Sequence, residues 1–354
     1  MNNIQQTDQK LFADIKQLID EAKIAVSKVV SSSLTSLYWN IGRRINNEIL
    51  KNERAEYGKQ IVVTVSRQLI KDYGNNFEEK NLRRMIQFAN QYPDVEIVAT
   101  LWRQLSWSHF LMLITIKDDL KRDFYAQMCS IEKWDVRTLR NKINSMLFER
   151  TAISRKPEEL MKLELKQLKE ENKLSPDLVF RDPYILDFLG LKDTYSEKDL
   201  EKAILYELEK FILELGVGFT FVTRQKRMII DGQDYHLDLL FYHRKLKRLI
   251  AIDLKIGKFE AAFKGQMELY LRWLEKYETE AGEEKPIGLI LCAEGNNELV
   301  ELLQLDTTNI KVAEYITEYL PNHLLKQKLH QFMLASKKQI QNRSTYLSDD
   351  NNDN

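Results

Sequence analysis

Hydrophobic positions follow two different periods along this chain, and the period changes near Gly218. Over residues 1–150, apolar residues recur every three to four positions, for example in 11–30 and 34–50, which predicts helices throughout. Beyond Gly218, short apolar runs have the composition and alternation of strands, and helical patterns separate the later runs. The chain is therefore predicted to join an all-helical N-terminal domain to a C-terminal domain that contains a sheet.

Residues 57–92 form a predicted pair of helices joined by a short turn. The first helix ends at Gly74, a residue suited to a helix C-terminus, and the second stops at Pro93. Arg83 and Arg84 lie outside the apolar stripe of the second helix. This pattern is compatible with a helix-turn-helix whose second helix enters a nucleic-acid groove. An ordinary helical hairpin with a solvated face gives the same pattern.

Residues 151–196 are predicted to be a charged, helical connector, and residues 197–216 a strongly amphipathic helix. Within this helix, Glu201 falls inside the apolar stripe and Glu207 near its edge. A carboxylate on a core-facing stripe costs free energy unless it has a partner, so Glu201 is a candidate site residue. Alternatively, Glu201 reaches solvent or complements the helix dipole, since it lies near the helix start.

Two apolar runs, 236–243 and 248–256, carry the candidate chemistry of the chain. If they pair as an antiparallel hairpin closed at the basic turn between them, Asp238 lies opposite Asp253. Lys255 then shares a face of the strand with Asp253. Charges within apolar strands are costly unless they pair with one another or bind a metal. One Asp–Lys pair leaves a second carboxylate without a partner, so the sequence predicts a divalent cation there.

The remaining pattern completes a mixed sheet flanked by helices. A helix is predicted over about 260–278, a buried strand over 286–295, a second strand over 310–316 after a short helix, and a long helix over about 321–342. The polar tail 343–354 is predicted to be disordered. Grouped strands followed by alternating helices and strands indicate an α+β or α/β fold. The predicted domains are 1–150, 151–196, 197–342 and 343–354.

Composition narrows the classes of protein that fit. A chain of 354 residues is long enough for two domains, and 44% hydrophobic with 30% charged residues is typical of a soluble globular protein. The formal net charge is zero, so nucleic acid would need a local basic surface. Cys129 and Cys292 fit no zinc-ligand spacing and are expected to be buried thiols in a reducing compartment. No membrane-spanning run and no N-terminal signal are found, so a cytoplasmic protein without a membrane partner is expected.

The hairpin and the helix after it resemble a known family. Asp238, the run Asp253-Leu254-Lys255, and Gln266 with Tyr270 resemble the signature of PD-(D/E)xK nucleases with a QxxxY helix. The chain from about 34 to 340 is more closely similar to the bacterial YhcG-type proteins. That likeness is carried by the segments LYWNIGRRI, LSWSHF, DPYILDFLGL, FILELGVGF, RQKR, DLLFYHR and LKIGKF. It implies a restriction-endonuclease-like αβββαβ core, a winged-helix-like helical N-terminal domain, and a nuclease that depends on Mg²⁺, or alternatively Mn²⁺.

The resemblance also implies roles for individual residues. Asp238, Asp253 and the main-chain carbonyl of Leu254 would hold the cation. Mg²⁺ prefers such oxygen ligands and needs only one or two carboxylates beside water and phosphate. Lys255 would orient a water or stabilise negative charge on the phosphate. Gln266 would fix Lys255, the water or a phosphate.

Three positions complicate the match to the family. Leu237 stands where the signature has Pro, and Asp253 replaces the commoner Glu, whose side chain is longer by one methylene. The carboxylate that the family carries on its preceding helix maps onto Glu201, with Glu207 as the second choice. Because the side chain of Asp253 is shorter, its distance to a cation can differ from that of the family's Glu.

Basic residues near the motif are candidates for phosphate contacts, although each is also typical of a solvated surface. They are Arg224, Lys226, Arg227, Arg244, Lys245, Lys247, Arg248, Lys258 and Lys264. Tyr270 of the following helix, and Arg83 and Arg84 of the N-terminal domain, complete the candidate nucleic-acid contacts.

Three functions are compatible with these patterns. The first is a metal-dependent phosphodiesterase that acts on DNA, with the N-terminal domain contributing nucleic-acid binding. The second is a nucleic-acid-binding or assembly module in which the nuclease core no longer cuts, which the zero net charge motivates. The third takes RNA as the substrate. A homodimer is compatible with all three.

Overall fold

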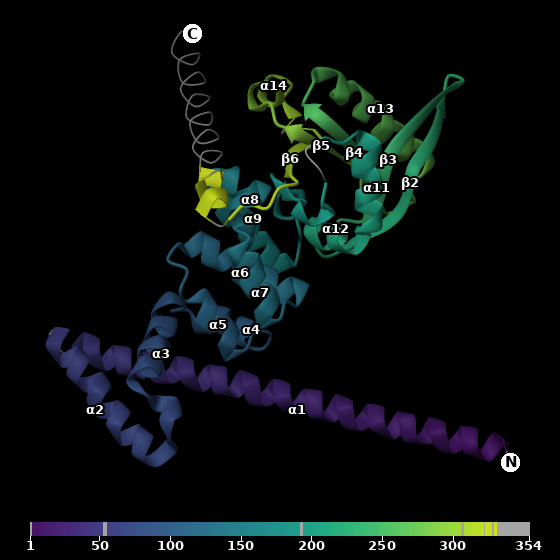
Figure 1. Cartoon of the computed structure of the whole chain (residues 1–354). Coiled ribbons are helices and arrows are strands. Elements are labelled where there is room, and N and C mark those ends of the chain that lie inside the picture. The colour runs from purple at the N-terminus through teal and green to yellow at the C-terminus, as the bar shows by residue number, and fades with distance from the viewer. Residues whose placement is uncertain are drawn as a thin grey trace, which may run out of the picture. The chain divides into compact units, whose positions relative to one another are not determined.

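A computed structural model describes residues 2–51, 55–191, 194–305, 308–321, 323–327 and 329–330. The chain divides into two compact units, Met1–Asn141 and Lys142–Asn354. Figure 1 shows helices in the first unit and helices around one sheet in the second. The predicted combination of an all-helical region with a mixed α/β region is confirmed.

Every element described in the first unit is a helix. The helices are α1 (Asn2–Lys51), α2 (Ala55–Tyr73), α3 (Glu79–Gln91), α4 (Val95–Trp102), α5 (Trp107–Leu113) and α6 (Asp119–Glu132), while α7 (Val136–Asn144) crosses the boundary. The predicted helix pair is present, with Gly74 at a φ of 84° directly after α2. Residues 2–51 and 55–141 contain no strand. These residues therefore have the helices of the predicted winged-helix-like domain but no β-hairpin wing, because they keep a helical period throughout.

The packing of α1 on α3 depends on a glycine. A Cβ atom added to Gly42 would lie 1.9 Å from the carbonyl oxygen of Met85, so the two backbones touch where the helices meet. Apolar side chains from α1, α2 and α3 are buried around this point, including Ile45, Val62 and Leu82. A larger residue at position 42 would have to separate the two helices.

The second unit is built on a six-stranded mixed sheet. Its strands are β1 (Tyr184–Ile185), β2 (Phe219–Ile230), β3 (Gln233–His243), β4 (Arg248–Lys258), β5 (Ile287–Glu294) and β6 (Ile310–Ile316), in the order β1-β6-β5-β4-β3-β2. Strands β2, β3 and β4 pair antiparallel, and the pairs β4–β5, β5–β6 and β6–β1 are parallel. Its helices are α8 (Leu147–Arg150), α9 (Glu158–Glu171), α10 (Pro176–Val179), α11 (Glu197–Tyr206), α12 (Leu208–Leu215), α13 (Ala261–Tyr277) and α14 (Asn297–Leu302). The predicted αβββαβ order is confirmed.

Helices cover both faces of this sheet (Figure 1). On one face, the α11/α12 core buries Leu200, Ile204, Phe211 and Leu215 against the strands. On the other face, the α13 core buries Met267, Tyr270, Leu271 and Leu274. Each large apolar side chain buried in this way contributes roughly 1.5–3 kcal/mol before conformational entropy is subtracted. The sheet is therefore the middle of three layers.

The predicted helix over 197–216 is in fact two helices that break at Glu207. Helix α11 packs against β4, whereas α12 packs against β1 and β2. One straight helix could not follow both parts of a twisted sheet, although the apolar stripe continues through the break.

Residues 151–196, predicted to be a connector, belong to the second unit. Their β1 strand pairs with β6, and the side chains of Arg150 and Arg181 both bind the Glu214 carboxylate of α12. Burial opposes the charge of Glu214, but the two arginines outweigh it and hold its pKa below the ordinary value. The predicted helix over 321–342 is helical at residues 323–327 and 329–330. Its remainder and the tail 343–354 lie outside the described residues.

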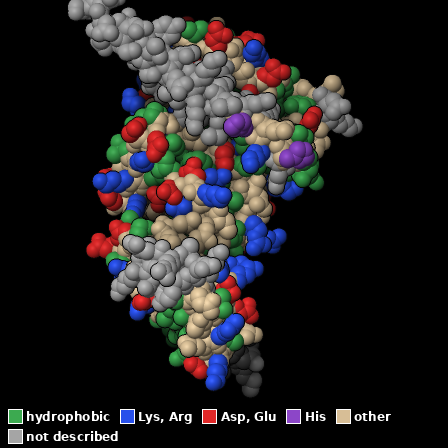
Figure 2. All heavy atoms as spheres, turned by 90° about the vertical axis from the view of Figure 1, so that its left-hand side faces the viewer, with side chains coloured by type: hydrophobic (Ala, Val, Ile, Leu, Met, Phe, Trp, Pro, Cys, Tyr) green, Lys and Arg blue, Asp and Glu red, His purple; other side chains and the backbone are tan. Residues whose placement is uncertain are grey.

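The surface carries charges of both signs. Figure 2 shows Lys and Arg side chains interspersed with Asp and Glu on the face in view, as the zero net charge leads us to expect. Within the described part of the chain, none of the helices is both long and apolar enough to cross a membrane.

We predict that the same substitution has opposite effects at two helical glycines. Gly42→Ala should lower the melting temperature, because overpacking costs about 1–3 kcal/mol. Gly265→Ala, on α13, should raise it slightly, because an added Cβ meets nothing within 4 Å and alanine favours a helix by about 1 kcal/mol. Thermal unfolding of both variants tests this, and stabilisation by Gly42→Ala would show that the two helices are not in contact there.

Candidate active site at the β3–β4 fork

Two facing carboxylates lie where strands β3 and β4 part. The strands pair from His243–Arg248 to Leu239–Ile252, which is the predicted register, and the next facing positions are Asp238 and Asp253. Beyond this point β3 remains paired with β2, and β4 with β5. We call this place the β3–β4 fork.

The main chain of Leu254 closes the fork. Its N–H donates to Oδ2 of Asp238 at 2.8 Å, in place of a bond between the two strands. The N–H and C=O of one strand residue point to the same side, so the Leu254 carbonyl also faces the fork. One oxygen of Asp238 is thus fixed beside a main-chain carbonyl.

Asp253 and Lys255 form a close ion pair with little access to water. Lys255 Nζ lies 2.9 Å from Asp253 Oδ2, and their side chains are 13% and 4% exposed. Burial raises the pKa of Asp253 to about 6. Asp238 and Glu197 add to this rise, and Lys255 partly offsets it. Burial also opposes the charge of Lys255, but these carboxylates outweigh it and raise its pKa.

The predicted helix carboxylate reaches the same place through a bridging amide. Gln225 Nε2, on β2, donates to Glu201 Oε2 at 2.9 Å and to Asp238 Oδ1 at 3.1 Å. Glu201 is 9% exposed, as its place in the apolar stripe predicts. Glu207, the second choice, lies at the helix break and pairs with Lys210. The structure therefore brings Glu201, not Glu207, to Asp238.

Gln266 and Tyr270 support the fork from α13. Gln266 Nε2 donates to the Tyr270 hydroxyl at 2.6 Å, and this hydroxyl donates to the carbonyl of His236 at 3.2 Å. Tyr270 is 1% exposed, so it cannot offer a surface to nucleic acid as the sequence suggested. Its hydroxyl instead holds the backbone two residues before Asp238.

The candidate phosphate-binding residues differ in whether an acidic side chain already pairs with them. Lys226 pairs with Glu278 at 2.7 Å, Arg227 with Asp234 at 2.8 Å, and Lys264 lies 3.7 Å from Glu268. Arg224 and Lys258 are exposed, and their side chains make no ion pair or hydrogen bond with any described residue. These two cations are therefore available to a ligand, and Arg224 pairs across the sheet with Leu239, next to Asp238.

The residues at the fork fit a hard divalent cation. Asp238, Asp253 and the Leu254 carbonyl could provide oxygen ligands, and Mg²⁺ takes its other ligands from water and phosphate. Within the described ranges, no cluster of three or more His, Cys, Asp or Glu side chains could hold a metal alone. The donor set thus suits a cation that shares its ligands with a substrate rather than a closed structural site.

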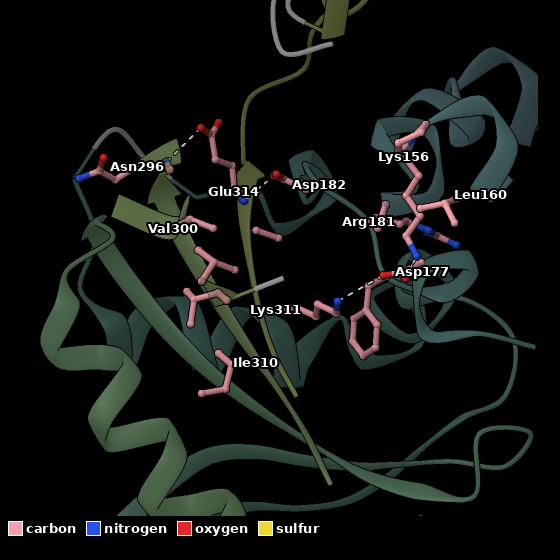
Figure 3. Close-up of a pocket in the computed structure, with 17 residues that line it drawn as sticks. Lys156, Leu160, Asp177, Arg181, Asp182, Asn296, Val300, Ile310, Lys311 and Glu314 are labelled. Carbon is pink, nitrogen blue, oxygen red and sulfur yellow. Dashed lines mark hydrogen bonds and ion pairs between the residues drawn. The ribbon is translucent and has the colours of Figure 1, made fainter. Parts of the chain in front are cut away.

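A separate cavity of about 460 Å³ lies beside β6 (Figure 3). Its basic residues already have acidic partners: Lys156 binds Glu164 and Asp177, Lys311 binds Asp177, and Arg181 binds Glu214. Asp182 Oδ1 accepts the main-chain N–H of Glu314, and the Glu314 carboxylate accepts the N–H of Gly295. None of the predicted site residues lines it, so the fork and the cavity are distinct.

The chain is similar to known proteins over most of its length. Residues 14–150 match the DUF1016 N-terminal domain, and residues 177–330 match the YhcG PDDEXK nuclease domain. An Escherichia coli protein named "Putative nuclease YhcG" is 35% identical over 316 residues, which cover 81% of this chain and 84% of that protein. The chain belongs to the YhcG family. Its second unit is therefore a PD-(D/E)xK nuclease domain, as the sequence predicted.

Among solved structures, a repair endonuclease from Pyrococcus abyssi is 21% identical, with a TM-score of 0.26 over 37% of this chain and 50% of that one. A structure entitled "Structure of EndoMS-dsDNA2 complex" is 17% identical, with a TM-score of 0.25 over 37% and 48% of the two chains. The chain spans about half the length of either structure.

Two residues at the fork were missed by the sequence analysis. The sequence predicted only a strand-like run around Gln225 and a helix that begins with Glu197, and it gave neither residue a role. Glu197 lies one turn before Glu201, and this spacing places both on one face of α11.

We predict an unusual pH dependence of stability in the metal-free protein. Because folding raises the pKa of Asp253 from 3.8 to about 6, the folded state binds more protons in this window and loses stability as the pH rises through it. The change approaches about 3 kcal/mol. Urea unfolding in EDTA measures this change as the difference between the protein and Asp253→Asn, with Asp231→Asn in the turn between β2 and β3 as the control. If the free energy of unfolding depended on pH in the same way in the protein and in Asp253→Asn, the raised pKa of Asp253 would be contradicted.

Proposed function

We propose that this protein is a nuclease that hydrolyses phosphodiester bonds in DNA with Mg²⁺, for which Mn²⁺ can substitute. The observation that carries the proposal is the β3–β4 fork, where buried Asp253 and its Lys255 partner face Asp238. Two carboxylates and an ammonium in a place shielded from water are costly for stability alone. A bound cation and a phosphate together offset that cost.

Each residue at the fork has a chemical role in this proposal. Asp238, Asp253 and the Leu254 carbonyl would hold the cation, which when bound polarises the phosphate and lowers the pKa of a water. Lys255, fixed at 2.9 Å from Asp253, orients the attacking water and stabilises negative charge that develops on the phosphate. Glu201 adds a third carboxylate on the helix side. Gln266 keeps its carbonyl oxygen free for a water or for Lys255, because its amide nitrogen binds Tyr270.

The helical N-terminal unit contributes nucleic-acid binding in this proposal. Arg83 of α3 is 48% exposed and makes an ion pair with Glu79 one turn earlier. Arg84 is partly buried and donates to Asn81 at 3.3 Å, so it is less available. The buried face of α3 consists of Leu82, Met85, Phe88 and Ala89, which leaves Arg83 on the solvated side.

We predict that cleavage requires both fork carboxylates and a divalent cation. Labelled linear, nicked and branched DNA should be cut with Mg²⁺ or Mn²⁺ and left intact in EDTA. Asp238→Asn and Asp253→Asn should reduce the rate on the order of 1,000-fold, since several kcal/mol of charge stabilisation are lost. Asp231→Asn, in the turn between β2 and β3, should cut normally.

Undiminished cleavage by folded Asp253→Asn would refute this active site. Faster cleavage of a matched RNA would reassign the substrate. Tight binding without cleavage of any substrate, with Mg²⁺ present, would instead indicate a non-cleaving binding module.

We predict that Arg83 contacts phosphate. In the Asp253→Asn background, Arg83→Ala should weaken duplex binding about equally for all sequences and reduce the slope of log affinity against log salt by about 1. Arg44→Ala is the matched control, because Arg44 also makes an exposed pair with a glutamate one turn away, Glu48. Fluorescence anisotropy at several salt concentrations measures both. Equal slopes for the two variants would leave α3 without a role in binding.

A further inference from the structure

Gln225 adopts a backbone conformation that its position in a strand does not explain. Its φ is 45°, in the left-handed region, and it is the only non-glycine residue of a described strand with a positive φ. The others lie at helix ends or in turns, as Asp231 and Lys247 do. This conformation costs about 1–2 kcal/mol for a residue with a side chain, so the surrounding structure must compensate.

The positive φ reverses the faces of two strands at once. On β3, Leu239 points into the α11/α12 core and Leu237 into the α13 core. On β2, Arg224 pairs with Leu239 and Lys226 with Leu237, so these two residues on either side of Gln225 also lie on opposite faces. Residues two apart on a regular strand share a face, so Leu237 and Leu239 show a reversal at Asp238. The reversal coincides with the β3–β4 fork.

The side chain of Gln225 satisfies two carboxylates with one amide group. Its Nε2 lies 2.9 Å from Glu201 Oε2 and 3.1 Å from Asp238 Oδ1. Ionised carboxylates only accept hydrogen bonds, so the NH₂ end of the amide must face them, and its two protons match the two acceptors. The amide thereby joins a helix of one layer to a strand of the sheet.

We propose that Gln225 is the positioning residue of the active site and sets the separation and orientation of Glu201 and Asp238 for the cation. The inference rests on the proposed function above. Without the bridge, the two like-charged carboxylates would repel one another and turn to solvent. Groups that hold metal ligands in place commonly contribute 10–100-fold to metal affinity. The left-handed backbone is the means by which a strand residue reaches both.

The test distinguishes the contribution of the Gln225 side-chain amide from that of its backbone conformation. Gln225→Gly removes the amide and tolerates a positive φ, so the fold should be kept. Thr220→Gly, an exposed position on the same strand, controls for placing a glycine in β2. Calorimetric titration of Mn²⁺ into the full chain without nucleic acid, together with the Mn²⁺ dependence of cleavage, gives two readouts. Thermal unfolding reports whether each variant is folded.

We predict that Gln225→Gly binds Mn²⁺ about 10–100-fold more weakly and needs correspondingly more Mn²⁺ for half-maximal cleavage. Its melting temperature should be no lower than that of Thr220→Gly, which should bind Mn²⁺ as the unmodified protein does. Equal Mn²⁺ affinity in Gln225→Gly and the unmodified protein would overturn the inference and leave the nuclease proposal standing. Absence of Mn²⁺ binding by the unmodified protein would overturn the nuclease proposal itself.

Discussion

The withdrawal of the Asp253 carboxylate from water is the constraint on which the rest of this domain depends. A buried carboxylate is tolerated only with a counter-charge, and here Lys255 provides one at 2.9 Å. The neighbouring Asp238 works in the opposite direction and helps to raise the pKa of Asp253 to about 6. Burial and Asp238 therefore both disfavour the ionised form of Asp253, and a bound cation would favour it.

This arrangement arises because strands β3 and β4 separate within the sheet. Up to Leu239 and Ile252 the strands β3 and β4 are bonded to each other, and beyond that pair each keeps only its outer neighbour. The backbone N–H of Leu254, freed from a strand partner, bonds to Asp238 instead. Helices α11 and α13 close the two faces, so Glu201 and Tyr270 approach the fork from opposite layers. The proposed catalytic groups thus lie on helices and strands rather than on loops.

Sequence alone predicted the parts of this site that depend on periodicity. Alternation identified the two strands, the basic turn between them set the register and hence the facing of Asp238 and Asp253, and the helical stripe singled out Glu201. Periodicity carries no information on the sign of φ, so Gln225 and the strand reversal were missed. The break at Glu207 was missed because the apolar stripe continues across it, and only the path of the sheet beneath requires two helices.

The outer face of α3 shows a second limit of prediction from sequence. An arginine on a solvated helix face has the same pattern whether or not it binds phosphate, so the sequence placed Arg83 correctly without establishing a role for it. Tyr270 shows the converse, because a tyrosine in a QxxxY helix suggested contact with nucleic acid, whereas its hydroxyl is used inside the protein.

The most direct test of the central claim is an anomalous difference map from crystals of the full chain soaked in Mn²⁺. The account predicts a peak at the β3–β4 fork, with oxygen atoms of Asp238, Asp253 and the Leu254 carbonyl at about 2.0–2.6 Å from it. A fork that stays empty while Mn²⁺ occupies another group of carboxylates, such as Asp182 and Glu314 beside β6, would contradict it.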